Sequence, residues 1–107
     1  MLGKRVCVTV DRPLGSTHPV YPTLRYPINY GYVKGFLAAD GEEQDAYILG
    51  VNEPIATFEG NVIAIIHRLD DVEDKWVVAP TGVSFTRAEI EEAVSFTERY
   101  FHFEIIM

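Results

Sequence analysis

The sequence has a single cysteine, Cys7, and lacks both a basic surplus and a long apolar run. One cysteine cannot form an internal disulfide, and its place in an alternating segment predicts a small, buried or half-buried side chain. The chain has only 9 Lys and Arg against 16 Asp and Glu, a net charge of −7. This balance argues against a nucleic-acid partner, because phosphate backbones are bound mainly by basic surface.

The apolar residues are never grouped in a run that approaches the roughly 20 residues of a membrane span. The N-terminal segment also lacks the apolar stretch of a signal peptide. We therefore expect a cytoplasmic protein with no membrane partner. A length of 107 residues predicts one domain, residues 1–107, with a core of modest size.

Alternation of polar and apolar residues, rich in β-branched and aromatic side chains, predicts short strands along most of the chain. The expected strands are Arg5–Val10, Tyr26–Phe36, Asp45–Val51, Asn61–Arg68 and Lys75–Ala79. Proline, glycine, serine and threonine mark residues 13–23 as a loop. Five short strands in succession indicate a small barrel or sandwich, a mainly β fold.

The C-terminal region has a different period. Thr86 and Glu89 have the spacing of a capping box, and apolar residues follow at helical intervals. We predict a helix from Arg87 to Phe101 whose apolar stripe packs against the barrel.

Two acidic clusters, Asp40–Asp45 and Asp70–Asp74, are the features most suggestive of chemistry. Carboxylates this close repel one another unless cations neutralise them, and ligand sets made only of oxygen select Mg²⁺ or Mn²⁺ over Zn²⁺. Metal-assisted phosphate chemistry is one interpretation. The alternatives are a solvated loop for the first cluster and an ordinary hairpin turn for the second.

Three segments together resemble a known family. The aromatic run Tyr26–Tyr32, the acidic cluster Asp40–Asp45 and the segment Lys75–Pro80 are similar to the soluble, magnesium-dependent inorganic pyrophosphatases. The resemblance covers residues 12–80, with a weaker echo at Ser95–Tyr100. It implies a five-stranded OB-like β-barrel with a C-terminal α-helix, in a chain shorter than typical members.

The resemblance also implies metal ligands. Asp40 and Asp45 match the outer acids of the family pattern, and Asp70 is similar to a further ligand. The remaining ligand is either Glu73 or Asp74, which the sequence leaves open. The implied cofactor is Mg²⁺, with Mn²⁺ as the alternative.

Catalytic residues are implied in the same way. Glu42 stands where the family has an aspartate that activates or orients the attacking water. Lys75 and Arg12 match phosphate-binding residues, and Tyr30 matches a tyrosine near the metal site, with Tyr26 supporting it. The alternatives are a solvated edge charge for Lys75 and a pair with a neighbouring acid for Arg12.

Two further positions concern the substrate. Tyr100 matches the first residue of a Tyr-Lys pair that holds phosphate in the family, but Phe101 occupies the lysine position. His18 lies in a Gly-Ser-Thr-His loop that could offer hydrogen-bond donors to phosphate, with a plain surface loop as the alternative.

The expected function is Mg²⁺-dependent hydrolysis of inorganic pyrophosphate, or of a closely related phosphoanhydride, by a metal-activated water. The alternative is a catalytically weakened regulatory domain that binds pyrophosphate or a nucleotide, which Glu42 and Phe101 favour. An oligonucleotide-binding barrel is disfavoured by the acidic charge. We also expect a homo-oligomer.

Overall fold

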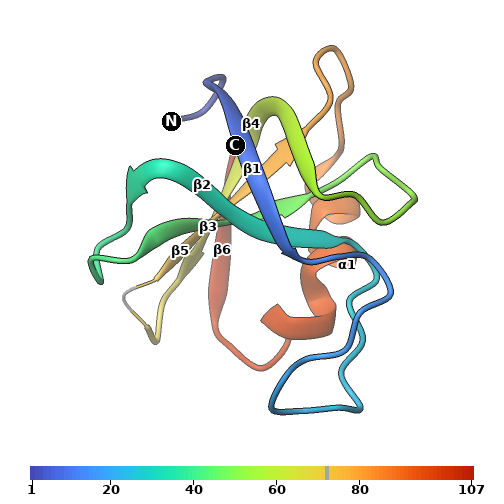
Figure 1. Ribbon diagram of the computed structural model, residues 1–107. Coiled ribbons are helices and arrows are strands. Elements are labelled where there is room, and N and C mark those ends of the chain that lie inside the picture. The colour runs from blue at the N-terminus through green and yellow to red at the C-terminus, as the bar shows by residue number, and fades with distance from the viewer. Residues whose placement is uncertain (72) are drawn as a thin grey trace.

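The computed structural model describes residues 1–71 and 73–107, which form six strands and one helix. The strands are β1 (Arg5–Arg12), β2 (Asn29–Leu37), β3 (Glu43–Ile48), β4 (Thr57–Arg68), β5 (Asp74–Ala79) and β6 (Phe103–Ile106). The helix α1 (Arg87–Glu98) follows β5 in the chain. Figure 1 shows the strands curling around a common centre, with α1 on one side of them.

The first five strands close into a barrel. Their order is β1-β2-β3-β5-β4, and β4 pairs again with β1. The pairs are antiparallel except for β3 and β5, which are parallel. Closure removes the open edges that a flat sheet would expose. The predicted five-stranded barrel is confirmed, and the sandwich is not found.

The sixth strand, β6, was missed by the sequence analysis. β4 is 12 residues long, so one edge pairs with β1 over residues 57–61 and with β6 over residues 65–68. Because β6 has only four residues and follows a helix, its own alternation is too short to predict a strand. These residues form a strand because they pair with residues 65–68 of β4.

The strands bury side chains on both faces, which gives two apolar clusters. One fills the barrel and includes Val8, Trp76 and Val78. The other lies between the barrel and α1, and includes Val77 and Ile90. Successive residues of β5 thus serve different clusters, as the period of two along a strand requires.

The helix begins as predicted and ends earlier. Thr86 Oγ1 accepts a hydrogen bond from Glu89 N at 3.1 Å, and Glu89 Oε1 accepts one from Thr86 N at 2.8 Å, so the capping box is confirmed. The predicted end at Phe101 is wrong. After Glu98 the chain makes tight three-residue turns that lead into β6. Within the described residues, no helix is long and apolar enough to cross a membrane.

The burial predicted for Cys7 is also wrong. Val6 and Val8 point into the barrel, so the residue between them faces out and Cys7 is exposed. Gly31 in β2 has a different constraint, because a Cβ atom there would lie 1.9 Å from the Thr9 oxygen of β1. Only glycine permits this close approach of the two strands.

Candidate active site

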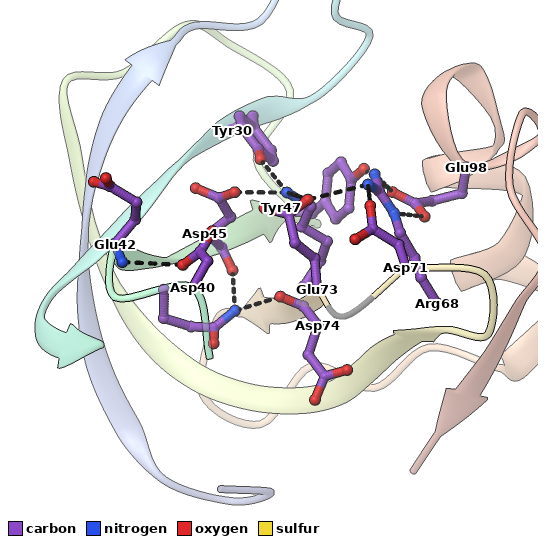
Figure 2. Close-up of polar contacts among 12 residues, drawn as sticks. Tyr30, Asp40, Glu42, Asp45, Tyr47, Arg68, Asp71, Glu73, Asp74 and Glu98 are labelled. Carbon is purple, nitrogen blue, oxygen red and sulfur yellow. Dashed lines mark hydrogen bonds and ion pairs between the residues drawn. The ribbon is translucent and has the colours of Figure 1, made fainter. Parts of the chain in front are cut away.

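The Lys75 ammonium is the centre of the candidate site. It lies 2.6 Å from Asp45 Oδ2 and 3.4 Å from Glu73 Oε2, and it donates to the Tyr30 hydroxyl at 3.1 Å. We call these four residues the lysine cluster. β2, β3 and β5 each contribute at least one of them, and Figure 2 shows Asp45, Tyr30 and Glu73 pointing toward one another. The lysine is 5% exposed, so it is not a solvated edge charge.

The two carboxylates of the lysine cluster keep access to water. The side chain of Asp45 is 33% exposed and that of Glu73 is 29% exposed. Burial raises the pKa of Tyr30, and the negative charge of Asp45 raises it further. The phenol therefore stays protonated and retains an O–H to donate. The cluster combines one cation, two carboxylates and one neutral hydroxyl.

A second group of charges lies deeper, between β4 and α1. Arg68 Nε donates to Glu98 Oε1 at 2.9 Å, and its terminal nitrogen donates to Glu98 Oε2 at 2.8 Å. The Tyr47 hydroxyl donates to the same carboxylate at 2.5 Å. We call these three residues the arginine cluster (Figure 2). Glu98 is fully buried and Arg68 is 6% exposed, so every polar contact here replaces a contact with water.

Sequence reasoning missed the arginine cluster. Nothing about Arg68 or Glu98 in the sequence links them, because they lie 30 residues apart in different elements. Burial alone lowers the pKa of Arg68, but the hydrogen bonds and charge of Glu98 outweigh it and the pKa is raised. The arginine therefore stays charged. A further arm of Arg68 reaches Glu73 at 3.2 Å and joins the two clusters.

The five predicted metal ligands do not all converge. Asp45 and Glu73 share the Lys75 ammonium, whereas Asp40 accepts from the backbone N of Glu42 in an exposed turn. Asp74 pairs with His67 at 2.7 Å, and Asp70 accepts from the backbone N of His102. Across residues 1–71 and 73–107, no three acidic, histidine or cysteine side chains group as a metal site would require.

Mg²⁺ is often held by one or two carboxylates together with substrate phosphates and water. Asp45 and Glu73, which both reach the same ammonium and both keep access to water, fit that arrangement. Of the two alternative ligands, Glu73 faces the Lys75 ammonium beside Asp45, whereas the carboxylate of Asp74 pairs with His67.

Three further predicted residues are Arg12, Tyr26 and Glu42. Arg12 donates to the backbone oxygen of Asp11 at 3.0 Å, and its charge opposes the rise in the pKa of Tyr26 that burial causes. Arg12 and Tyr26 are thus neighbours. Glu42 is exposed in the turn that holds Asp40, and Figure 2 shows it apart from Tyr30 and Glu73.

A cavity of about 690 Å³ opens beside the lysine cluster. Its lining comes from the loop between β1 and β2, from the strands, and from the end of α1 with the residues after it. The cavity includes the predicted substrate residues His18, Tyr26, Lys75 and Tyr100. Phe101 also lines it and stacks on Arg68, with the guanidinium 3.7 Å from the ring centre.

Comparison with known proteins identifies the family of the chain. The family model described as inorganic pyrophosphatase matches residues 6–101. The chain belongs to the inorganic pyrophosphatase family. The match includes every predicted site residue, and it confirms the family and the type of enzyme expected from the sequence. None of the curated proteins matches the sequence.

Solved structures of inorganic pyrophosphatases share the fold. The chain is similar to the enzyme from Ehrlichia chaffeensis, with a TM-score of 0.72 and 17% identity, over 97% of this chain and 85% of that one. The enzyme from Neisseria gonorrhoeae gives 0.69 and 21%, over 92% and 74%. The one from Thermus thermophilus gives 0.66 and 16%, over 96% and 80%. The predicted OB-like fold is confirmed.

Gln44, next to Asp45 in the first acidic cluster, has a structural role in this pyrophosphatase. Its amide donates to the backbone oxygen of Asp74 at 2.6 Å and to that of Asp45 at 3.1 Å. It therefore ties β3 to the start of β5, which are the strands that carry Asp45 and Lys75.

Proposed function

We propose that this chain hydrolyses inorganic pyrophosphate to two phosphates with Mg²⁺ as the cofactor, Mn²⁺ being an alternative. The observation that carries the proposal is the convergence of Asp45, Glu73 and Tyr30 on the Lys75 ammonium beside the cavity. A bound Mg²⁺ would neutralise pyrophosphate charge and lower the pKa of a bound water. Asp45 and Glu73 are its proposed ligands.

The remaining residues act on the substrate. The Lys75 ammonium pairs with the carboxylates of Asp45 and Glu73, and a phosphate oxygen of the substrate can replace one of them as its partner. Arg12 offers a planar pair of donors to the leaving phosphate, and Tyr26 beside it orients that side chain. Tyr30 donates its hydroxyl proton to an oxygen of the same site. Each group stabilises charge that grows as the bridging bond breaks.

The outer residues complete the proposal. Asp40 and Asp70 supply further negative charge for metal capture from exposed turns, and Glu42 adds to that charge from the turn it shares with Asp40. Tyr100 and His18 contact the substrate from the cavity wall. We also propose a cytoplasmic homo-oligomer, as the sequence leads us to expect.

The activity is tested by phosphate release from pyrophosphate with Mg²⁺ and with excess chelator. We expect turnover that requires the metal. Pyrophosphate bound without any phosphate release would support the alternative regulatory domain, which the stacking of Phe101 in place of a lysine favours. Neither binding nor release would contradict both.

Asp45→Asn tests the metal site independently of turnover. Loss of one of two proposed carboxylate ligands should weaken Mg²⁺ binding by about tenfold or more, as measured by calorimetric titration. Glu59→Gln is the matched control, because Glu59 is an exposed β4 carboxylate that pairs with Arg5, outside the site. Equal Mg²⁺ affinity in the two variants would remove Asp45 from the site.

A further inference from the structure

The cavity is larger than pyrophosphate requires. Its volume of about 690 Å³ falls within the range of about 300–1,000 Å³ that encloses drug-sized organic ligands. Pyrophosphate is only two phosphoryl groups, and the charges proposed to hold it are gathered at the lysine cluster. Much of the cavity therefore lies beyond the groups that would hold the phosphates.

Aromatic rings line the rest of the cavity in a continuous series. Tyr21 contacts His18 with ring centres 5.2 Å apart, and His18 lies parallel to Tyr26 at 6.4 Å. Tyr26 contacts Tyr30 at 5.7 Å. The Tyr30 hydroxyl accepts from Lys75, so the series runs from the exposed loop to the lysine cluster. An elongated ligand with an anionic end and an aromatic end would match this order.

Two of the lining rings are largely exposed. Tyr21 is 63% exposed and Tyr100 is 66% exposed, although they come from segments at opposite ends of the chain. Exposed rings gathered at one cavity are a typical platform for stacking a base or another flat ring. The loop that carries Tyr21 is ordered by His18, whose Nδ1 accepts from the backbone N of Val20 at 3.0 Å and of Tyr21 at 3.2 Å.

Arg99 is a third cation that lines the cavity, after Lys75 and Arg68, and it lies against Tyr100. Arg99 donates to the Tyr100 hydroxyl at 3.0 Å, and its guanidinium lies 5.1 Å from the centre of the Tyr100 ring. In the described part of the chain, no carboxylate lies within ion-pair distance of Arg99, in contrast to Arg68 and Lys75. Its charge is available to a ligand, by contact with a phosphate oxygen or by stacking on a ring.

We propose that the site accepts nucleoside diphosphates, which are phosphoanhydrides that carry an aromatic base. The phosphates would bind at Lys75, and the base would stack against Tyr21 and Tyr100. This inference rests on the proposed hydrolytic function. In the reaction, a water oxygen bonds to the terminal phosphorus and the bridging P–O bond breaks. The electron pair leaves with the nucleoside monophosphate, and the proton of the water passes to solvent.

The experiment compares ADP, pyrophosphate and tripolyphosphate by phosphate release and by calorimetric binding, all with Mg²⁺. We expect ADP to be bound and hydrolysed. Tyr21→Ala should lower the ratio of kcat/KM for ADP to that for pyrophosphate by about tenfold, because the base loses the ring on which it stacks. Tyr21→Phe keeps the ring and should retain the ratio.

Leu37→Ala is the control, because Leu37 is 72% exposed and does not line the cavity. Hydrolysis of pyrophosphate and tripolyphosphate with no binding of ADP would overturn this inference and leave the proposed function intact. The same ratio in Tyr21→Ala and Leu37→Ala would overturn it as well. Failure to hydrolyse any of the three compounds would overturn both proposals.

Discussion

The lysine cluster and the arginine cluster use the same kinds of side chain in different surroundings. Each has one cation, at least one carboxylate and one tyrosine hydroxyl. In the arginine cluster the carboxylate of Glu98 is fully buried, whereas those of Asp45 and Glu73 are about one third exposed. The closed cluster fixes α1 on the barrel, and the open one can exchange its partners for a ligand.

The difference follows from the strength of charge interactions in each place. A buried pair is strong only while it is complete, because removing one partner leaves the other uncompensated in a medium of low polarity. A pair open to water loses less when it is broken, since water replaces the lost partner. We therefore expect mutations in the arginine cluster to act on stability and mutations in the lysine cluster to act on activity.

The largest expected effect on stability is that of Glu98→Gln. The substitution removes the fully buried carboxylate that binds two nitrogens of Arg68 and leaves the guanidinium only the partly exposed Glu73 and Asp71, which should lower the free energy of unfolding by about 3–5 kcal/mol in urea titrations. Glu92→Gln, on the exposed face of the same helix, is the control and should change it by less than about 0.5 kcal/mol. Equal stability of the two variants would contradict a closed structural cluster.

A second substitution tests whether the stranded charge is the cause. Adding Arg68→Met to Glu98→Gln removes the cation as well, so part of the lost stability should return, as found when a buried pair is replaced by apolar groups. A double variant less stable than Glu98→Gln alone would show that packing of the arginine stem matters more than its charge.

In the lysine cluster, Lys75→Met should lower kcat for pyrophosphate by about 100-fold, the range of single electrostatic stabilisers. Its effect on unfolding should be smaller than that of Glu98→Gln, since Asp45 and Glu73 keep contact with water. Lys34→Met, an exposed position on β2, is the control. An unchanged kcat with lowered stability would instead assign Lys75 to structure.

Phe101→Lys tests whether position 101 belongs with the arginine cluster or with the substrate site, because Phe101 contacts Arg68 and also lines the cavity. The ring stacks on the Arg68 guanidinium at 3.7 Å, so a lysine there loses a cation–π contact and adds a like charge. We expect a loss of about 1–2 kcal/mol in stability and no gain in pyrophosphate turnover. Phe101→Leu removes the ring without adding charge and should lose less. A gain in kcat for Phe101→Lys would show that the ammonium reaches substrate.

The smallest expected effect concerns His67 and Asp74, a half-exposed pair at 2.7 Å. The hydrogen bond to Asp74 raises the pKa of His67 above its ordinary value. The pair therefore contributes its full stabilisation below the pH at which the unfolded histidine titrates, and loses it as the pH rises through the folded pKa. Tm should fall slightly across that interval, and Asp74→Asn should remove this component of the pH dependence. An identical Tm profile in Asp74→Asn would contradict the assignment.

Patterns along the chain were sufficient to predict the barrel strands, the capping box and the family. Period-two alternation marks β1, a short apolar run with β-branched residues marks β5, and the Thr86–Glu89 spacing marks the start of α1. All three signals depend on neighbours a few residues away. The family resemblance of Tyr26–Tyr32, of the first acidic cluster and of Lys75–Pro80 led us to expect Tyr30, Asp45 and Lys75 in one site.

What the sequence could not decide depends on partners far along the chain. The strand β6 exists because β4 extends beyond β1, and Arg68 is buried because Glu98 and Tyr47 meet it from other elements. Glu73 faces Lys75 and Asp74 faces His67, although the two residues are neighbours in the chain. A local pattern depends on the spacing of residues that are close in the sequence. These contacts join residues that only the closed barrel brings together, so only the tertiary structure shows them.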